Sequence, residues 1–530
     1  MEKSARPDRF RRLEKERFDV VVIGAGMGGL TAAALLGRHG KSVLVIDRHY
    51  VAGGNATVFK RPGYEFDVGL HYIGDCGPGG IIPAILHAAG TAEVRMAPLD
   101  PDGFDTLIFP DFRFRVPAGW EAYRARLLEY FPSDRRGIDR YMAVLRQVQL
   151  LERLVRKPWM FPWIVPRASL ALRSVNCTLG EFLDTCTRNP QLRAVLAAEN
   201  GDYGQPPSRV SLVLHAGLMN HFFRQGAFYP EGGGQILSDR LANAIESHGG
   251  KILLNTHAVQ VLVRDGRAIG VELENKHVGR RIVHASTVVS NADIKQTLLE
   301  LIEPSHVSHS TRKKTRAYEM SPGLGIVYLG LTRDLRAEGL PNTNFFVSPG
   351  YDYEAAYAAT RAGRFCHDPA VFLTSSSIKD PHNPKYAPDG ITNLQVMSLA
   401  PSAPAAWGVS EEDFASGSYR KKESYRRHKE EYAETLLVQA ERAIGGLRSQ
   451  VAFQEVATPL THRRYTWSTG GTSYGIALTP EQFLHRRPGP RTEIQGLILC
   501  GASTRTGHGI VGSMLSGVMA ARACKVPVHL

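Results

Sequence analysis

The sequence predicts an α/β fold: a doubly wound sheet, mainly parallel and assembled from separated parts of the chain, with an inserted α+β region. Three observations predict it. Residues 20–23 form a buried-strand run that breaks directly into a glycine-rich turn and then a helix-forming run. Residues 43–46 form a second apolar run, typical of a buried parallel strand. Further strand-like and glycine-rich segments recur in the middle of the chain and near its end.

The first turn has the pattern Gly-x-Gly-x-x-Gly, with Gly24, Gly26 and Gly29 at the fixed positions and Gly28 between them. Gly24 permits the tight turn, Gly26 lets a pyrophosphate approach the backbone, and Gly29 lets the helix lie close to the sheet. The helix N-terminus then offers amide hydrogens and a positive dipole end to phosphates. The pattern therefore predicts a bound dinucleotide.

Asp47 stands at the end of the second strand, about 20 residues after the first glycine. A carboxylate there can accept hydrogen bonds from the ribose hydroxyls of adenosine. The pair Gly53 and Gly54 follows soon after and allows another close backbone approach. An ordinary nicotinamide-binding unit does not need this pair, whereas a flavin dinucleotide that lies extended through the protein does. We therefore expect FAD as the cofactor.

Three separated blocks of the chain resemble the phytoene desaturase superfamily of FAD-dependent enzymes. This superfamily includes bacterial carotenoid desaturases, plant-type carotenoid isomerases and retinol saturases. The blocks are residues 20–74, 228–293 and 496–512. Because they lie at both ends and in the middle of the chain, chance is a poor explanation for the match. The resemblance implies a Rossmann-like FAD-binding sheet that is discontinuous in sequence.

The resemblance also implies how the chain is divided. The FAD-binding domain would consist of residues 16–75, 228–300 and 492–530. Residues 76–227 read as a largely helical segment that faces the substrate or a membrane. Residues 301–491 contain strand-like runs that fit a substrate domain with a sheet beneath a cavity.

The resemblance assigns further cofactor contacts. In the superfamily, the residue that matches Val259 contacts the adenine through its backbone. The last block is a strand followed by a glycine-rich turn and a helix, which would present backbone amides to the ribityl and isoalloxazine end. The contacts implied in this block are Gly501, Ala502, Gly509, Ile510 and Val511. Many flavoproteins of this fold have an acid in place of Ala502, whereas bacterial carotenoid desaturases look similar to this chain here.

The resemblance implies an FAD-dependent oxidoreductase that acts on carbon–carbon bonds of a lipophilic polyene, such as a carotenoid or a retinoid. FAD would carry the hydride, and a saturation reaction would also need a proton. His71, Tyr72 and His508 are the candidate proton donors because their motifs flank the expected flavin end. Each of the three could instead pack in the core or contact the cofactor.

The motifs leave the reaction open. Residues 70–74 resemble the retinol saturases, residues 458–465 the saturase and isomerase branch, and residues 501–504 the desaturases. A carotenoid cis–trans isomerase that uses reduced FAD without net redox change is a second hypothesis. A non-enzymatic lipid carrier of the same fold, like the Rab GDP-dissociation inhibitors, is a third, and a nicotinamide-dependent dehydrogenase is a fourth. The acid after the second strand and the glycine turns disfavour the carrier.

The composition excludes several other functions. No run approaches the ~18 consecutive apolar residues of a membrane-spanning helix, and the charged residues 1–17 do not resemble a secretory signal. The six cysteines are scattered, and no group of residues has the spacing of a metal site. The net charge is +13, but no nucleic-acid-binding motif is present. We expect no metal, no nucleic-acid partner and a cytoplasmic location, in solution or peripheral on a membrane surface.

Residues 150–173 interleave aromatic and basic side chains with prolines. The apolar members are Trp159, Met160, Phe161, Trp163, Ile164 and Val165, and the basic members are Arg153, Arg156, Lys157, Arg167 and Arg173. This composition suits the interface of an anionic bilayer, from which a peripheral enzyme could draw a lipophilic substrate. The alternative is that the aromatic side chains pack in the core and the arginines are solvated.

Overall fold

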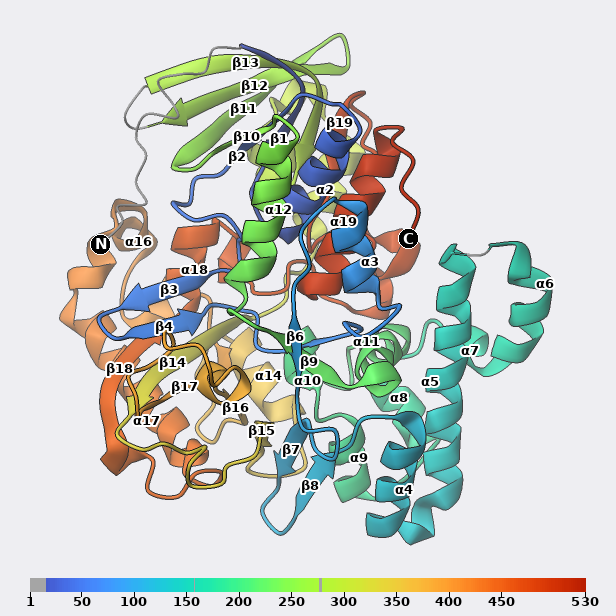
Figure 1. The fold of residues 1–530 in the computed structure, drawn as a ribbon, viewed down its shortest axis with the longest axis vertical. Coiled ribbons are helices and arrows are strands. Elements are labelled where there is room, and N and C mark those ends of the chain that lie inside the picture. Colours follow the sequence, from blue (N-terminus) through green and yellow to red (C-terminus); the bar gives the residue numbers. More distant parts are fainter. Residues whose placement is uncertain (1–15, 157, 276–278) are drawn as a thin grey trace.

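The computed structural model describes residues 16–156, 158–275 and 279–530, and it contains two seven-stranded sheets at opposite ends of the molecule (Figure 1). The expectation for the N-terminal tail falls largely on residues 1–15, which lie outside the described residues, as does Lys157. Within the described part, none of the helices combines the length and the apolar character needed to cross a bilayer.

The first sheet contains the predicted strand–helix–strand unit. Its strand order is β10-β2-β1-β13-β12-β11, and β19 pairs with β13. The pairs formed among β10, β2, β1, β13 and β19 are parallel, whereas β12 and β11 form an antiparallel extension. The parallel strands therefore come from all three blocks. The bounds are β1 (Arg17–Ile23), β2 (Val43–Ile46), β10 (Lys251–Leu253), β11 (Thr256–Arg264), β12 (Arg267–Asn275), β13 (Gly279–Ser290) and β19 (Leu497–Leu499).

Strand β1 is buried on both faces, as its continuous apolar run predicts. Val20 and Val22 belong to a core cluster that also contains residues of the helices that cover this face. Val21 and Ile23 belong to a separate cluster on the opposite face, where residues of β11, β12 and the segment after β13 provide the cover. The helices of the first face are α2 (Met27–Arg38), α12 (Gln235–Ser247) and α19 (Gly509–Ala523), and α2 packs against the other two.

The second sheet has the order β18-β14-β17-β16-β15-β7-β8 and is antiparallel except between β15 and β7. Strands predicted at residues 326–329 and 370–373 lie within β14 and overlap β16. β7 and β8 come from the largely helical segment, so both inserted segments share one sheet. The bounds are β7 (Asp105–Ile108), β8 (Arg113–Val116), β14 (Gly323–Leu331), β15 (Asn344–Val347), β16 (Val371–Thr374), β17 (Thr392–Ala400) and β18 (Val451–Ala457).

Helices dominate the rest of residues 76–227, and α6 stands out from the body of the molecule beside α5 and α7 (Figure 1). The helices are α3 (Ile81–Ala88), α4 (Trp120–Tyr130), α5 (Arg135–Arg156), α6 (Phe161–Ile164), α7 (Ser169–Arg173), α8 (Leu179–Asp184), α9 (Pro190–Leu196), α10 (Asn200–Tyr203) and α11 (Leu212–Gln225). Two small sheets contain β3 (Val58–Arg61) with β4 (Tyr64–Asp67), and β5 (Ile73–Gly74) with β9 (Ala227–Pro230) and β6 (Met96–Pro98).

The charged stretch 411–441, which the sequence predicts as helical with a solvated face, is divided in the structure. α16 ends before Gly417, whose φ of +75° is a left-handed conformation that suits glycine. α17 then buries Tyr425, Tyr432 and Leu436 against the second sheet's core. The remaining helices are α13 (His309–Ala317), α14 (Glu354–Arg361), α15 (Ser376–Lys379), α16 (Glu411–Ser416), α17 (Glu423–Ala440) and α18 (Pro459–Thr466).

Candidate cofactor and active site

The three blocks converge at the carboxyl ends of the parallel strands. The amide of Asn291, which follows β13, donates to the carbonyl of Ile23 at 2.7 Å. The amide of Gly53 donates to the carbonyl of Ala25 at 2.7 Å, and that of Cys500 donates to the last residue of β13 at 2.9 Å. Ligands of open α/β sheets bind at this end of the strands.

The side chain of Asn291 fills the point where the blocks cross. A Cβ atom at Gly26 would lie 2.8 Å from Nδ2 of Asn291, and one at Gly28 would lie 2.6 Å from its Oδ1. A Cβ atom at Gly501 would lie 2.8 Å from the same Oδ1. These approaches are too close for real Cβ atoms, so a larger residue at any of the three positions would force the Asn291 side chain to shift. No local pattern in the sequence indicates that the Asn291 side chain reaches the glycine turns.

The other two glycines of the first turn serve its geometry. Gly24 has a φ of +97°, in the region that favours glycine. A Cβ atom at Gly29 would lie 2.1 Å from the carbonyl oxygen of Gly24. Gly29 therefore lets α2 pack directly under the turn.

Asp47 lies at the end of β2 beside this turn. Its Oδ2 accepts a hydrogen bond from the amide of Ala25 at 2.7 Å, and its Oδ1 accepts one from the amide of His49 at 2.8 Å. Burial raises the pKa of this carboxyl, and the two backbone hydrogen bonds oppose the rise. Each oxygen retains a lone pair for a ribose hydroxyl. Nearby, the guanidinium of Arg48 lies 4.6 Å from the centre of the Trp467 ring, and this pair offers flat surfaces suited to an adenine.

Two helices begin at the site without a capping side chain. The N-cap residue of α2 is Gly26 and that of α19 is His508, and neither makes a side-chain hydrogen bond to its helix. Neither first turn contains an acidic residue. Their first amides and positive dipole ends are therefore available to an anionic ligand.

A cavity of about 2060 Å³ runs past these groups. Ligand pockets usually enclose roughly 300 to 1,000 Å³, so this cavity has room for a dinucleotide and a second ligand. The predicted site residues that line it are Gly24, Gly26, Gly28, Asp47, Gly53, Gly54, His71, Tyr72, Gly501, Ala502, His508, Gly509, Ile510 and Val511. Gly29 lies behind the lining, and Val259 does not reach it, because the neighbouring residues 256–258 form that wall.

These groups together fit FAD. The glycine turns leave space for a pyrophosphate, Asp47 suits a ribose, and the uncapped end of α19 suits the polar edge of a flavin. When bound, FAD supplies hydride transfer at carbon. Within the ranges that the structure describes, no group of three or more His, Cys, Asp or Glu side chains is arranged to hold a metal ion.

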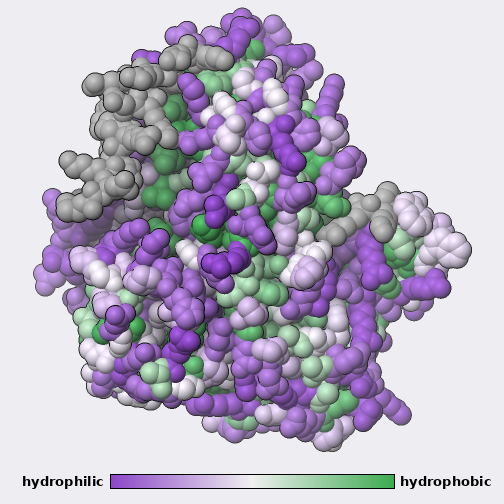
Figure 2. Space-filling view, in the orientation of Figure 1, coloured by the Kyte–Doolittle hydropathy of each residue, from purple (hydrophilic) through white to green (hydrophobic). Residues whose placement is uncertain are grey.

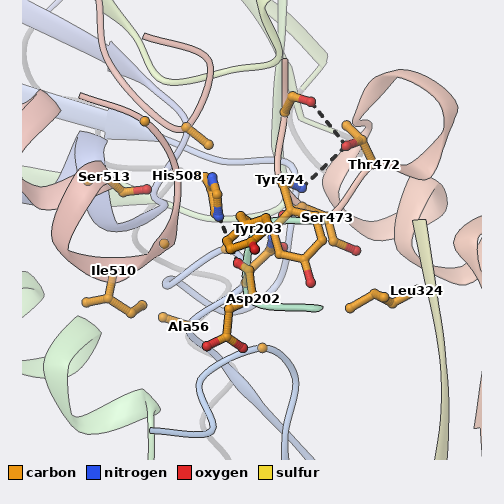
Figure 3. A pocket seen from close by; sticks show the side chains of 18 of the residues that line it. Ala56, Asp202, Tyr203, Leu324, Thr472, Ser473, Tyr474, His508, Ile510 and Ser513 are labelled. Atoms are coloured by element: carbon orange, nitrogen blue, oxygen red, sulfur yellow. Dashed lines mark hydrogen bonds between the residues drawn. The ribbon is translucent and has the colours of Figure 1, made fainter. Parts of the chain in front are cut away.

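The three candidate proton donors all line the cavity, and burial shifts the pKa values of the two histidines and of the tyrosine in opposite directions. Burial lowers the pKa of His71 to about 3 and that of His508 to about 4, so both rings are neutral near neutral pH. Burial raises the pKa of Tyr72 well above its usual value, so the phenol keeps its hydrogen. Nε2 of His508 lies 2.9 Å from the backbone carbonyl of Asp202, and its ring packs edge-on against Tyr474 (Figure 3).

Buried acids that the sequence analysis did not select lie next to Tyr72. The Tyr72 hydroxyl donates to Oδ2 of Asp202 at 2.6 Å and lies 3.3 Å from Oε2 of Glu199. Asp105, on β7, lies beside Glu199 and accepts a hydrogen bond from Asn344 at 2.8 Å. Burial raises the pKa of all three carboxyls, to about 6 for Asp202 and about 8 for Asp105. The only local sign of these acids in the sequence is weak: Glu199 and Asp202 follow directly after an apolar helical run.

Lys379, at the end of α15, is the basic residue in this buried cluster of ionisable side chains. Its Nζ donates to the backbone carbonyl of His71 at 2.7 Å. Burial lowers the pKa of this ammonium to about 7, and the charges of Asp105 and Asp67 oppose the fall. Lys379 therefore holds the backbone that carries Tyr72 into the cavity.

Known proteins resemble this chain over most of its length. It is 30% identical to the all-trans-retinol 13,14-reductase of Homo sapiens over 489 residues, which cover 87% of this chain and 77% of that protein. It is 25% identical to prolycopene isomerase 2, chloroplastic, of an Oncidium hybrid cultivar over 527 residues, which cover 96% of this chain and 84% of that protein. An oxidoreductase from Methanosarcina mazei has the same fold, with a TM-score of 0.64, 19% identity, and coverage of 94% of this chain and 98% of its own.

These findings confirm the predicted α/β fold with an FAD-binding sheet, the resemblance to the carotenoid and retinoid FAD enzymes, and FAD as the cofactor. They also confirm that the protein is an FAD-dependent oxidoreductase, which sets aside the carrier and nicotinamide hypotheses. The sequence model of one protein family, the flavin-containing amine oxidoreductases, matches residues 27–525 of this chain. The chain belongs to the family of flavin-containing amine oxidoreductases.

Proposed function

We propose that this flavoprotein acts on the carbon–carbon bonds of a lipophilic polyene, such as a carotenoid or a retinoid, and that it adds hydrogen across a double bond. The observation that carries the proposal is the extension of the cavity beyond the FAD-binding groups into an apolar compartment. The names of the two relatives, a retinol reductase and a prolycopene isomerase, agree with a polyene ligand.

Apolar side chains line the compartment, and they come from α5, α11 and the second sheet. They include Val148, Leu151, Leu214, Leu218, Phe346 and Phe372. A ligand gains roughly 25 cal/mol for each Å² of apolar surface that it buries, so a long polyene can bind here without a charged anchor. The compartment therefore supports a polyene rather than a polar substrate.

The buried acids support hydrogen addition over hydrogen removal. Addition needs a protonated acid, whereas removal needs a base. Burial raises the pKa of Glu199 well above its usual value and that of Asp105 to about 8. The cavity wall thus has protonated carboxyl groups close to it.

Product mass tests the proposed function. The purified yellow protein is mixed without oxygen with dithionite and one member of a polyene panel, and the product is analysed by mass spectrometry. Saturation raises the mass of the polyene by two hydrogens. Unchanged mass and unchanged isomer composition across the panel, from protein with a full complement of FAD, would contradict the proposal.

Isomerisation is a second candidate, because the Oncidium relative named as an isomerase matches nearly the whole chain. An isomerase that uses reduced FAD would leave the mass unchanged but shift the absorption spectrum and the chromatographic retention of the polyene. The same incubation therefore separates the two reactions.

We also propose that the projection around α6 contacts a lipid surface. Trp159, Phe161 and Trp163 are 70%, 60% and 64% exposed, which opposes their packing in the core. Figure 2 has pale and green residues at the tip of this projection. Exposed aromatic side chains near arginines suit an anionic bilayer interface. Leu172, on α7, lines the cavity and is 39% exposed, so the cavity reaches the surface beside the projection.

Flotation with vesicles tests this contact. We expect the protein to float with phosphatidylcholine vesicles that contain phosphatidylserine, and to float less with pure phosphatidylcholine or at high salt. The triple variant W159S/F161S/W163S should remain at the bottom, whereas Val438→Ser, at another exposed apolar side chain on α17, should float like the wild type. Equal flotation of the triple variant and the wild type would contradict the contact.

A further inference from the structure

We propose that Asp202 is the acid that delivers the proton to the substrate carbon, and that Tyr72 and Glu199 behind it hold it in place and restore its proton. The proposal rests on the proposed function, namely hydrogen addition to a polyene double bond. It adds a proton donor that neither the sequence motifs nor the family match assigns.

Asp202 lies at the wall of the cavity with one carboxyl oxygen engaged. Its Oδ2 accepts the hydrogen bond of 2.6 Å from the hydroxyl of Tyr72. Its Oδ1 has no hydrogen-bond partner among the residues that the structure describes, and Asp202 is one of the residues that line the cavity. The carboxyl group can therefore present a proton on Oδ1 to a ligand.

The contact between Tyr72 and Glu199 completes a short chain of oxygen atoms. The phenol has one hydrogen, which the shorter contact directs to Asp202. The Tyr72 oxygen then accepts from Glu199 at 3.3 Å when Glu199 is protonated. Burial, with the charges of Asp105 and Asp202, raises the pKa of Glu199, so it holds that proton. A proton given up by Asp202 can be restored by transfer from Glu199 through Tyr72.

Hydrogen bonds to the backbone fix Asp202 near the beginning of α19. Its carbonyl lies 2.9 Å from Nε2 of His508, the N-cap residue of α19. The hydroxyl of Tyr474 donates to the carbonyl of Gly201 at 2.6 Å. Figure 3 places Asp202 among His508, Tyr474 and Ala56 on the cavity wall. The acid therefore lies beside the turn and helix that fit the flavin end of the cofactor.

The hydrogen balance of the reaction is simple. The double bond takes up one hydride, which reduced FAD supplies when bound, and one proton, which Asp202 supplies. The O–H bond of Asp202 breaks as a C–H bond forms at the double-bond carbon next to the one that takes the hydride. The Asp202 carboxylate is then reprotonated from Glu199 through Tyr72, and Glu199 is reprotonated from solvent. The electrons come from an external two-electron reductant, for which dithionite serves in the test.

The ionisable groups around Asp202 set the pH dependence. Asp105 on β7 and Glu199 before α10 interact with its charge, and His508 contacts its backbone carbonyl. The phenols that interact with its charge are Tyr72, Tyr203, Tyr357 and Tyr474. Burial raises the pKa of Asp202, and the hydrogen bond from Tyr72 lowers it. Because the proton donor must be protonated, the rate of saturation should fall as the pH rises through the pKa of Asp202.

Asp202→Asn tests the donor with little change of shape. We expect D202N to retain FAD and its reduction by dithionite, and to saturate the polyene roughly 10²- to 10⁴-fold more slowly. Infrared difference spectra of D202N should also lack one carboxylic-acid carbonyl band that the wild type has. The matched control Asp389→Asn, at an exposed loop acid, should keep the wild-type rate and bands.

Tyr72→Phe provides an independent readout. Loss of its hydrogen bond should raise the pKa of Asp202, so the alkaline fall of the pH–rate profile should move to higher pH. Saturation by D202N at the wild-type rate, or an unmoved profile in Y72F, overturns the role of Asp202. If the wild type itself leaves the polyene mass unchanged, the proposed function fails instead, and the two failures are thereby distinguished.

Discussion

The buried guanidinium of Arg487 donates from Nη2 to the backbone carbonyl of Ala502 at 2.7 Å. Its Nε and Nη1 donate to the carbonyls of Thr504 and Ile476, each at 2.9 Å. Burial lowers the pKa of this guanidinium to about 9. The turn of the third block, which carries an alanine where many flavoproteins of this fold have an acid, is thus held from behind by a cation.

Arg487→Met should loosen this turn and reduce FAD retention. The variant removes the donor to the carbonyls of Ala502 and Ile476, whereas the carbonyl of Thr504 keeps a hydrogen bond from the amide of Gly507. Each buried carbonyl left without a donor costs about 1 to 3 kcal/mol. The free energy of unfolding, measured with urea, should fall by at least about 2 kcal/mol. Arg336→Met, at an exposed arginine, is the matched control and should change it by less than about 0.5 kcal/mol. An R487M protein of wild-type stability would show that other groups hold the turn.

Gly28→Ala should disrupt the crossing of the three blocks. The new Cβ atom would lie 2.6 Å from Oδ1 of Asn291 and 2.9 Å from Oγ of Ser516. We expect overpacking to cost roughly 1 to 3 kcal/mol of unfolding free energy, together with a loss of bound FAD that absorbance measures. Gly445→Ala, where a Cβ atom meets nothing within 4 Å, should change neither quantity. Full FAD occupancy in G28A would contradict the tight crossing.

Asp47→Asn should weaken FAD binding with little change of the apoprotein. The amide oxygen of asparagine can still accept from Ala25, but the charge that would bind the ribose hydroxyls is lost. A hydrogen bond to a charged group is worth about 1.5 to 3 kcal/mol, so the Kd for FAD should rise roughly 10- to 150-fold. Fluorescence titration of apoprotein with FAD measures it. An unchanged Kd would remove Asp47 from the cofactor site.

Asp105→Asn should flatten the pH dependence of stability. The pKa of Asp105 rises from 3.8 to about 8 on folding, so its contribution to stability is fully present below the lower value and is lost as the pH approaches the higher one. The variant keeps an oxygen for the hydrogen bond from Asn344. We expect the wild type to lose stability across this window more steeply than D105N, which should be the more stable protein at the alkaline end.

Urea denaturation at a series of pH values measures the difference. Lys379, whose pKa falls to about 7, titrates in both proteins, and loss of the Asp105 charge should lower its pKa further in D105N. Parallel pH profiles of the two proteins would mean that Asp105 is ionised in the folded state.

The sequence alone predicted the cofactor half of the candidate site. Strand periodicity, the need for glycine at a tight turn and the acid after the second strand are local requirements, so Gly24, Gly26 and Asp47 could be identified without the fold. The Asp265-Gly266 pair between two strand-like runs is another local feature, because it predicts a hairpin turn, and both residues have the positive φ that such a turn requires.

Only the tertiary structure decided the rest. Tyr72, Glu199 and Asp202 meet because the small sheet that contains β5 and the helices around α10 pack together, and no local pattern encodes that packing. The Asn291 side chain likewise reaches three glycines from two other blocks. Neighbouring residues determine the local backbone geometry. Side chains that are far apart in sequence come together only when the whole chain has folded, and only then does burial change their pKa values.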